Sequence, residues 1–106
     1  MGERKDEALE TFKISLPRIK EKFTPERVYL FGSRARGEEL VQSDLDIIIV
    51  SKKFCGIRFM DRITEVIKLI DPPVGIDLLC YTPQEFESKK KEIGIVRESL
   101  KYAREL

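Results

Sequence analysis

Two aspartates one residue apart, Asp44 and Asp46, stand at the start of the apolar run 47–50. In a strand, residues two apart point to the same face and lie about 6–7 Å from each other, so both carboxylates would project together. Burying ionised carboxylates beside apolar residues is costly unless an opposite charge pairs with them. Hard divalent cations prefer carboxylate oxygens, so the pair indicates a metal site. The alternative is a solvated acidic pair at a strand start.

A third acid, Asp77, stands near the beginning of a second apolar run, 75–81. If the two runs form neighbouring strands, Asp77 completes a three-carboxylate site with Asp44 and Asp46. If they do not, Asp77 is an edge residue that faces water. The sequence leaves both arrangements open.

The segment between the first apolar run and Asp44 has the residues of a phosphate-binding turn. Gly32 ends the run 27–31, and Ser33 is a favourable N-cap for a short helical turn, which offers backbone N–H groups and a hydroxyl to a phosphate. Arg34 and Arg36 carry positive charge into the same turn and could bind phosphate oxygens. Each feature alone also fits an ordinary turn with surface arginines. Together with the acids they predict metal-assisted chemistry on a phosphate.

The composition narrows the chemistry further. The chain has no histidine, which excludes histidine-based acid–base chemistry, and its two cysteines, Cys55 and Cys80, lack the spacing of a zinc site. The net charge of +1 predicts no direct nucleic-acid binding and no membrane surface as partner. Asparagine is absent whereas Lys, Arg and Glu are abundant, a bias typical of thermophile proteins.

The length of the chain predicts the number of domains, and its apolar stretches predict the cellular compartment. A chain of 106 residues is near the common size of one domain, so we expect a single domain over 1–106. No apolar stretch reaches the roughly 18–20 residues of a membrane span, and the first residues lack the apolar run of a secretion signal. A cytoplasmic protein is therefore expected.

The periodicity of apolar residues predicts the elements that position these side chains. Strands are expected at 27–31, 44–50 and 75–81, a loop at 52–56, and helices at 59–70, 83–91 and 93–106. A first helix carries its apolar residues at spacings of three and four, and Pro17 predicts a kink or a new start inside it. The sequence therefore predicts an α/β (α+β) fold: a small mixed sheet of three or four strands with helices packed on it.

The string Gly32-Ser33, ten residues, then Asp44-Leu45-Asp46, with the later strand acid Asp77, resembles the nucleotidyltransferase superfamily of the DNA polymerase β-like fold. More closely, it is similar to the minimal nucleotidyltransferases (MNT proteins) of archaea and bacteria. The resemblance covers nearly the whole chain, from the helix before Arg27 to Phe86.

That resemblance implies a role for each matched position. Asp44 and Asp46 would bind two metal ions, Mg²⁺ or alternatively Mn²⁺, and Asp77 would join the ion that activates the acceptor. Gly32 and Ser33 would hold the outer phosphates of ATP, the expected substrate, with Arg34 and Arg36 as further phosphate contacts. The implied reaction is attack of a hydroxyl on the α-phosphate of the nucleotide, with pyrophosphate leaving.

Relatives of this type are often encoded beside a HEPN partner. In such toxin–antitoxin pairs the MNT protein is the antitoxin, and some transfer AMP to a tyrosine of the HEPN ribonuclease (AMPylation). The resemblance therefore implies a HEPN-type partner, with a homo-oligomer left open.

Two other functions fit the same residues. One is an antitoxin, or a nucleotide-binding module, that acts by contact with little catalysis. The other is a transferase to a small molecule such as an aminoglycoside. Apolar residues on both sides of the last predicted helix suggest an interface there, with core packing as the alternative.

Overall fold

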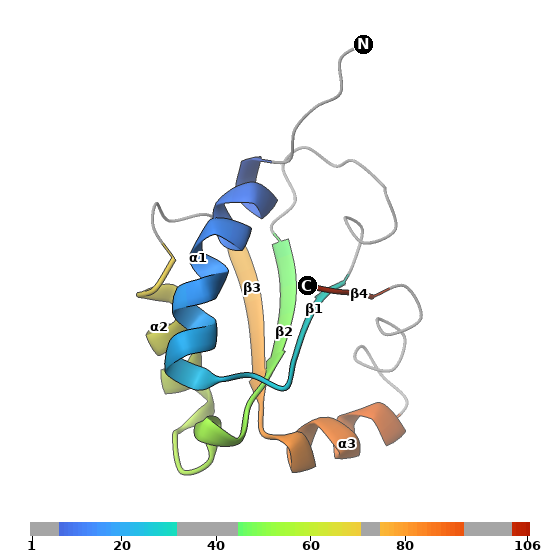
Figure 1. Ribbon diagram of the computed structural model, residues 1–106. Coiled ribbons are helices and arrows are strands. Elements are labelled where there is room, and N and C mark those ends of the chain that lie inside the picture. Colours follow the sequence, from blue (N-terminus) through green and yellow to red (C-terminus); the bar gives the residue numbers. More distant parts are fainter. Residues whose placement is uncertain (1–6, 32–44, 71–74, 93–102) are drawn as a thin grey trace.

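The computed structural model describes residues 7–31, 45–70, 75–92 and 103–106 (Figure 1). In chain order the elements are α1 (Glu7–Phe23), β1 (Arg27–Phe31), β2 (Leu45–Val50), the 3₁₀ helix η1 (Lys52–Phe54), α2 (Phe59–Ile67), β3 (Ile76–Tyr81), α3 (Pro83–Lys91) and β4 (Arg104–Glu105). The three predicted strands are present. The single-domain assignment stays a prediction.

The four strands form one mixed sheet in the order β3-β2-β1-β4. β1 runs antiparallel to both β2 and β4, whereas β2 and β3 are parallel. Parallel strands need a crossover connection, and the segment that contains η1 and α2 supplies it. The predicted α/β (α+β) class with a small mixed sheet is confirmed.

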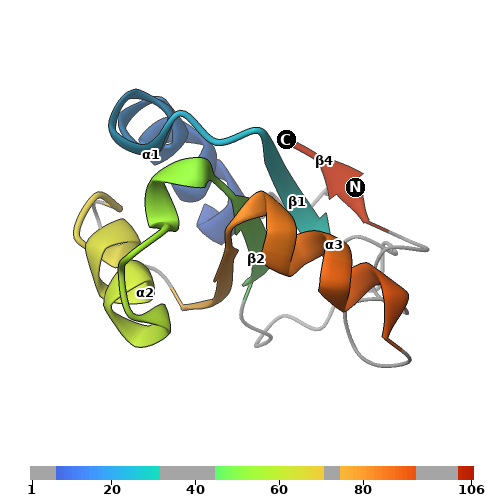
Figure 2. The same cartoon turned by 90° about the horizontal axis from the view of Figure 1, so that it is seen from below.

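The two faces of the sheet are covered by different helices. α1 and α2 lie on one side of the sheet and α3 on the other, as Figures 1 and 2 show. β2 divides its side chains between them: Leu45, Ile47 and Ile49 join the larger core, and Ile48 and Val50 join a smaller cluster with Phe86 of α3. The alternation follows from the period of two in a strand.

The first helix follows its predicted apolar stripe and is unbroken at Pro17. Its five buried apolar residues are those of the sequence pattern, namely Leu9, Phe12, Leu16, Ile19 and Phe23. α1 extends from Glu7 to Phe23 with Pro17 inside it, so the predicted new start of a helix at Pro17 is wrong.

The predicted apolar stripe of the second helix is confirmed in part. Its members are Phe59, Ile63, Val66, Ile67 and Ile70. Val66 and Ile70 are buried and Ile63 packs against the core, whereas Phe59 and Ile67 are 37% and 42% exposed and Arg62 is buried instead. Because the buried face includes an arginine, counting apolar residues alone misses its centre.

The end of the chain also differs from the prediction. A helix was expected over 93–106, but Arg104–Glu105 forms β4 and pairs with β1, where Tyr29 faces Glu105. The backbone of Leu106 donates a hydrogen bond to the carbonyl of Val28. A free sheet edge offers hydrogen-bonding groups to this segment, which helical periodicity does not reveal. Residues 93–102, and the helical turn expected at 33–36, lie outside the described residues.

Candidate active site

Two of the three predicted acids are direct neighbours across the sheet. Asp46 of β2 and Asp77 of β3 are register partners in the parallel pair, and adjacent strands lie about 4.8 Å apart. Each alternates with residues of the smaller cluster, Ile48 on β2 and Leu79 on β3, so both acids belong to the face that α3 covers. The two apolar runs are thus neighbouring strands, as a shared site for Asp46 and Asp77 requires, although β3 is also the edge strand and Asp77 is exposed.

This pair suits a hard cation. Asp46 is half-buried and Asp77 is exposed, so one carboxylate is anchored in the sheet and the other is open to a ligand. Two like charges on adjacent strands repel each other, and a divalent ion between them relieves that repulsion. Within the described part of the chain no group of three His, Cys, Asp or Glu side chains converges, and the third expected ligand, Asp44, lies outside it.

The remaining predicted site residues belong to the segment that joins β1 to β2. Phe31, the last residue of β1, pairs with Asp46, and residue 32 follows it directly in the chain. That segment contains Gly32, Ser33, Arg34, Arg36 and Asp44, which lie outside the described residues. Their roles in phosphate and metal binding stay predictions.

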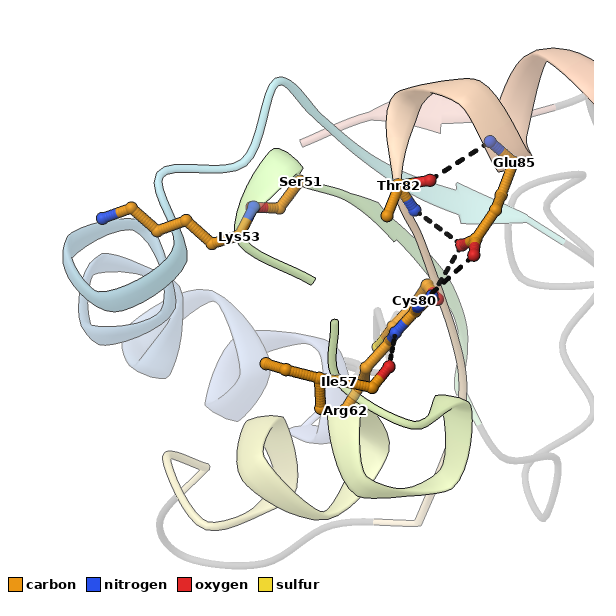
Figure 3. Close-up of polar contacts among 7 residues, drawn as sticks. All are labelled: Ser51, Lys53, Ile57, Arg62, Cys80, Thr82 and Glu85. Atoms are coloured by element: carbon orange, nitrogen blue, oxygen red, sulfur yellow. Dashed lines mark hydrogen bonds and ion pairs between the residues drawn. The ribbon is translucent and has the colours of Figure 1, made fainter. Parts of the chain in front are cut away.

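A buried arginine connects the elements at the opposite end of β3 (Figure 3). Arg62 of α2 is 6% exposed. Its guanidinium donates hydrogen bonds to the carbonyls of Ile57 (2.8 Å) and Cys80 (3.0 Å). It also donates two to the carboxylate of Glu85, at 2.6 and 3.2 Å. One side chain thus joins α2, β3 and α3.

Glu85 also completes the N-terminus of α3. Its carboxylate accepts a hydrogen bond from the backbone of Thr82, and its own N–H donates to the Thr82 hydroxyl, so the two residues form a capping box. The hydrogen bond from Arg62 lowers the pKa of Glu85 below its ordinary value of 4.5. A charged Glu85 therefore caps α3 and neutralises the buried guanidinium.

Sequence reasoning did not single out Arg62, although a signal was present. Arg62 lies four residues before Val66 and eight before Ile70, which is the spacing of the buried side of a helix. An arginine at such a position needs an acidic partner and carbonyl acceptors.

Cys80 of β3 is fully buried and packs as a small hydrophobe. Burial raises the pKa of its thiol to about 12, so it stays protonated near neutral pH. Cys55 is exposed. Neither belongs to a cluster of metal-binding side chains within the described ranges.

The fold and the paired acids together define a class. A mixed sheet that carries carboxylates at neighbouring strand starts is suited to an enzyme that acts on phosphate esters through a cation. In the described part of the chain no helix has the length and apolar character needed to cross a membrane.

Comparison with known proteins identifies the family. Residues 13–103 match the family model of the nucleotidyltransferase domain. Over 94 residues the chain is 31% identical to "Probable protein adenylyltransferase MntA" of Haemophilus influenzae, covering 87% of this chain and 80% of that protein. The chain therefore belongs to the nucleotidyltransferase family, within the minimal nucleotidyltransferases, and is a nucleotidyltransferase enzyme.

One solved structure agrees with this assignment. The crystal structure of a candidate nucleotidyltransferase from Sulfolobus solfataricus matches with a TM-score of 0.59 and 31% identity, over 83% of this chain and 84% of that one. BolA1 from Arabidopsis thaliana matches with a TM-score of 0.54 and 18% identity, over 71% and 94% of the two chains. The second likeness concerns the fold alone.

Proposed function

We propose that this nucleotidyltransferase transfers AMP from ATP to a tyrosine hydroxyl of a HEPN-type protein and thereby acts as its antitoxin. The observation that carries the proposal is the direct register of Asp46 and Asp77 on parallel strands. The name of the Haemophilus relative, a protein adenylyltransferase, supports AMP as the transferred group and a protein as the acceptor.

The proposed reaction is a single displacement at phosphorus. The acceptor oxygen bonds to the α-phosphorus of ATP, the bond from that phosphorus to the bridging oxygen of the β-phosphate breaks, and pyrophosphate leaves. Asp77, the exposed acid, accepts the hydroxyl proton, while Ser33 and the Gly32 turn hold the outer phosphates.

Divalent ions complete the proposed site. Asp44, Asp46 and Asp77 would hold two ions, Mg²⁺ or Mn²⁺, which when bound stabilise negative charge on the attacking and leaving oxygens. The two described carboxylates fit such ions because both offer oxygen ligands from neighbouring strands.

Label transfer tests the proposal. The chain is incubated with Mg²⁺, the purified HEPN-type protein and ATP labelled at either the α- or the γ-phosphate. We expect the α-label on the HEPN tyrosine and no transfer of the γ-label. Asp44→Ala combined with Asp46→Ala should lower the rate by about 10³-fold or more, as loss of essential charge stabilisation does.

The controls separate this proposal from its alternatives. Asp61→Ala, which removes an exposed acid from the first turn of α2, should transfer at the wild-type rate. Removing metal with EDTA should stop transfer, and added Mg²⁺ or Mn²⁺ should restore it. A stable complex without transfer would instead support an antitoxin that acts by contact. Transfer to an aminoglycoside alone would support the small-molecule function.

A further inference from the structure

A pocket of about 470 Å³ lies on the acid-bearing side of β3 and is lined by Phe59, Leu79, Tyr81, Glu85 and Lys89. Leu79 and Tyr81 follow Asp77 at spacings of two and four, so they share its face of the strand. At about 3.3 Å per residue, the pocket begins roughly 7 Å from Asp77 and extends to roughly 13 Å.

The strand order assigns this pocket to one side of the site. In the order β3-β2-β1, β1 ends at Phe31, directly before the predicted phosphate-binding residues in the chain, whereas the pocket lies at β3, across β2. If the nucleotide phosphates occupy the β1 side, the β3 side remains for the group that attacks. Asp77, the proposed proton acceptor, is on that same strand.

We propose that this pocket binds an apolar side chain of the acceptor protein, two to four residues from the reactive tyrosine and next to acidic residues. The inference rests on the proposed function and names the surface by which the acceptor is recognised. An extended peptide advances about 3.3 Å per residue, so two to four residues span the distance from Asp77 to the pocket.

The walls of the pocket favour an apolar occupant. Phe59 is 37% exposed and its ring lies 5.7 Å from that of Tyr81, which leaves aromatic surface open. Burying aromatic surface of this kind stabilises a complex, and aromatic side chains dominate protein interfaces.

The charges of the pocket favour acidic neighbours in the acceptor. α3 ends in three lysines, Lys89, Lys90 and Lys91, and Lys89 lines the pocket. Its ion pair with Glu92 is 3.6 Å long and largely exposed, so it competes weakly with a partner's carboxylate. Glu85 is already bound by Arg62. Lys90 is likewise paired with Glu87, at 2.9 Å, and both lysines stay partly exposed, so an acidic acceptor can exchange with these weak surface ion pairs.

The pocket is also held in shape before anything binds. The guanidinium of Arg62 donates hydrogen bonds to the carboxylate of Glu85 and the carbonyl of Cys80, and it lies 5.8 Å from the ring of Phe59. These contacts fix α2, β3 and α3 relative to one another. A preformed site loses less conformational freedom on binding than a flexible one.

Steady-state transfer kinetics with the HEPN-type protein test the inference. Phe59→Ser and Lys89→Glu should each raise the KM for that protein about 10-fold, the effect of losing part of one buried aromatic contact or one interfacial charge pair, with kcat unchanged. The matched controls are Ile14→Ser, an apolar residue 70% exposed on α1, and Lys53→Glu, an exposed lysine of η1. Both should keep KM within about twofold, as surface changes outside an interface do.

The outcomes separate the two proposals. If wild-type protein transfers label but both pocket variants keep the wild-type KM, the pocket is not the acceptor surface, although the proposed function stands. If the controls raise KM as much as the pocket variants, the same conclusion follows. If wild-type protein transfers no label to the HEPN-type protein, the proposed function fails and this inference fails with it. Circular dichroism of each variant confirms that it is folded.

Discussion

Asp46 and Ile47 are consecutive residues of β2, but they lie on opposite faces of the sheet: Ile47 in the apolar core and Asp46 on the face that carries the acids. On the side of Ile47, apolar residues of β2 are fully buried beneath α1 and α2. On the side of Asp46, one end of β2 carries Val50, which is buried in the same cluster as Phe86 of α3. The other end carries the half-buried carboxylate of Asp46. One strand therefore contributes to both the core and the candidate site, through alternate residues.

The comparison shows how a small domain separates stability from chemistry. The larger cluster depends on side-chain volume, whereas the acid-bearing face combines a smaller cluster of aromatic and aliphatic residues, an ion pair, and one half-buried and one exposed carboxylate. Changes on the first face should therefore alter the free energy of unfolding, and changes at the acids should alter transfer. The following predictions test that division.

The largest effect on stability is expected from the core face. Ile47→Ala removes a fully buried side chain and should lower the free energy of unfolding by about 2–5 kcal/mol, from lost burial and the cavity left behind. Urea denaturation followed by circular dichroism measures it. Ile14→Ala, at a site 70% exposed, is the control and should cost less than about 1 kcal/mol. Equal costs at both sites would refute the assignment of this face as the core.

A smaller loss is expected from the arginine that joins α2, β3 and α3. Arg62→Met preserves much of the side-chain length but removes the guanidinium, so the carbonyl of Cys80 and the carboxylate of Glu85 lose a donor. We expect a loss of about 2–3 kcal/mol, since Glu85 is partly exposed and water can replace some of the contact. A variant as stable as wild type would show that the ion pair contributes nothing net.

The same pair predicts a dependence on pH. Because Arg62 lowers the pKa of folded Glu85 below 4.5, the stabilisation by charged Glu85 is present above that pH and is lost as pH falls through the folded pKa. Thermal unfolding of wild type and Glu85→Gln should therefore differ most near neutrality and converge in acid. A difference that grows on acidification would contradict this sign.

The smallest perturbation is chemical modification of the thiols. In the folded chain at pH 8, an excess of iodoacetamide should modify the exposed Cys55 and leave Cys80 intact, because Cys80 is buried and its pKa is raised to about 12. Mass spectrometry should find one adduct on the native chain and two after unfolding. Two adducts under native conditions would show that the core opens around β3.

Local sequence signals predicted much of the fold. The apolar spacing of α1, the Ile-rich run of β2 and the Thr82–Glu85 capping box each correspond to an observed element. These features depend on residues close in the chain. β4 was missed because its pairing with β1 joins segments more than 70 residues apart, and no periodic signal reports such a contact.

The candidate site was predicted less completely than the fold. The sequence allowed Asp46 and Asp77 to meet only if their two apolar runs formed neighbouring strands, and the register of β2 with β3 shows that they do. The helical spacing of Arg62 gave a signal that it is buried, but its acidic partner, Glu85, lies on a distant helix and could not be assigned from the sequence. Spacing therefore predicts pairs within an element or on adjoining strands more readily than pairs between helices.

The most direct test of the central claim, that Asp77 acts in transfer and not in folding, combines two readouts on one variant. Asp77→Asn retains the size of an exposed side chain but removes its charge. We predict that α-label transfer to the HEPN-type protein falls by about 10²-fold or more, as for loss of a general base, while the free energy of unfolding changes by less than about 1 kcal/mol. Wild-type transfer by this variant would contradict the account.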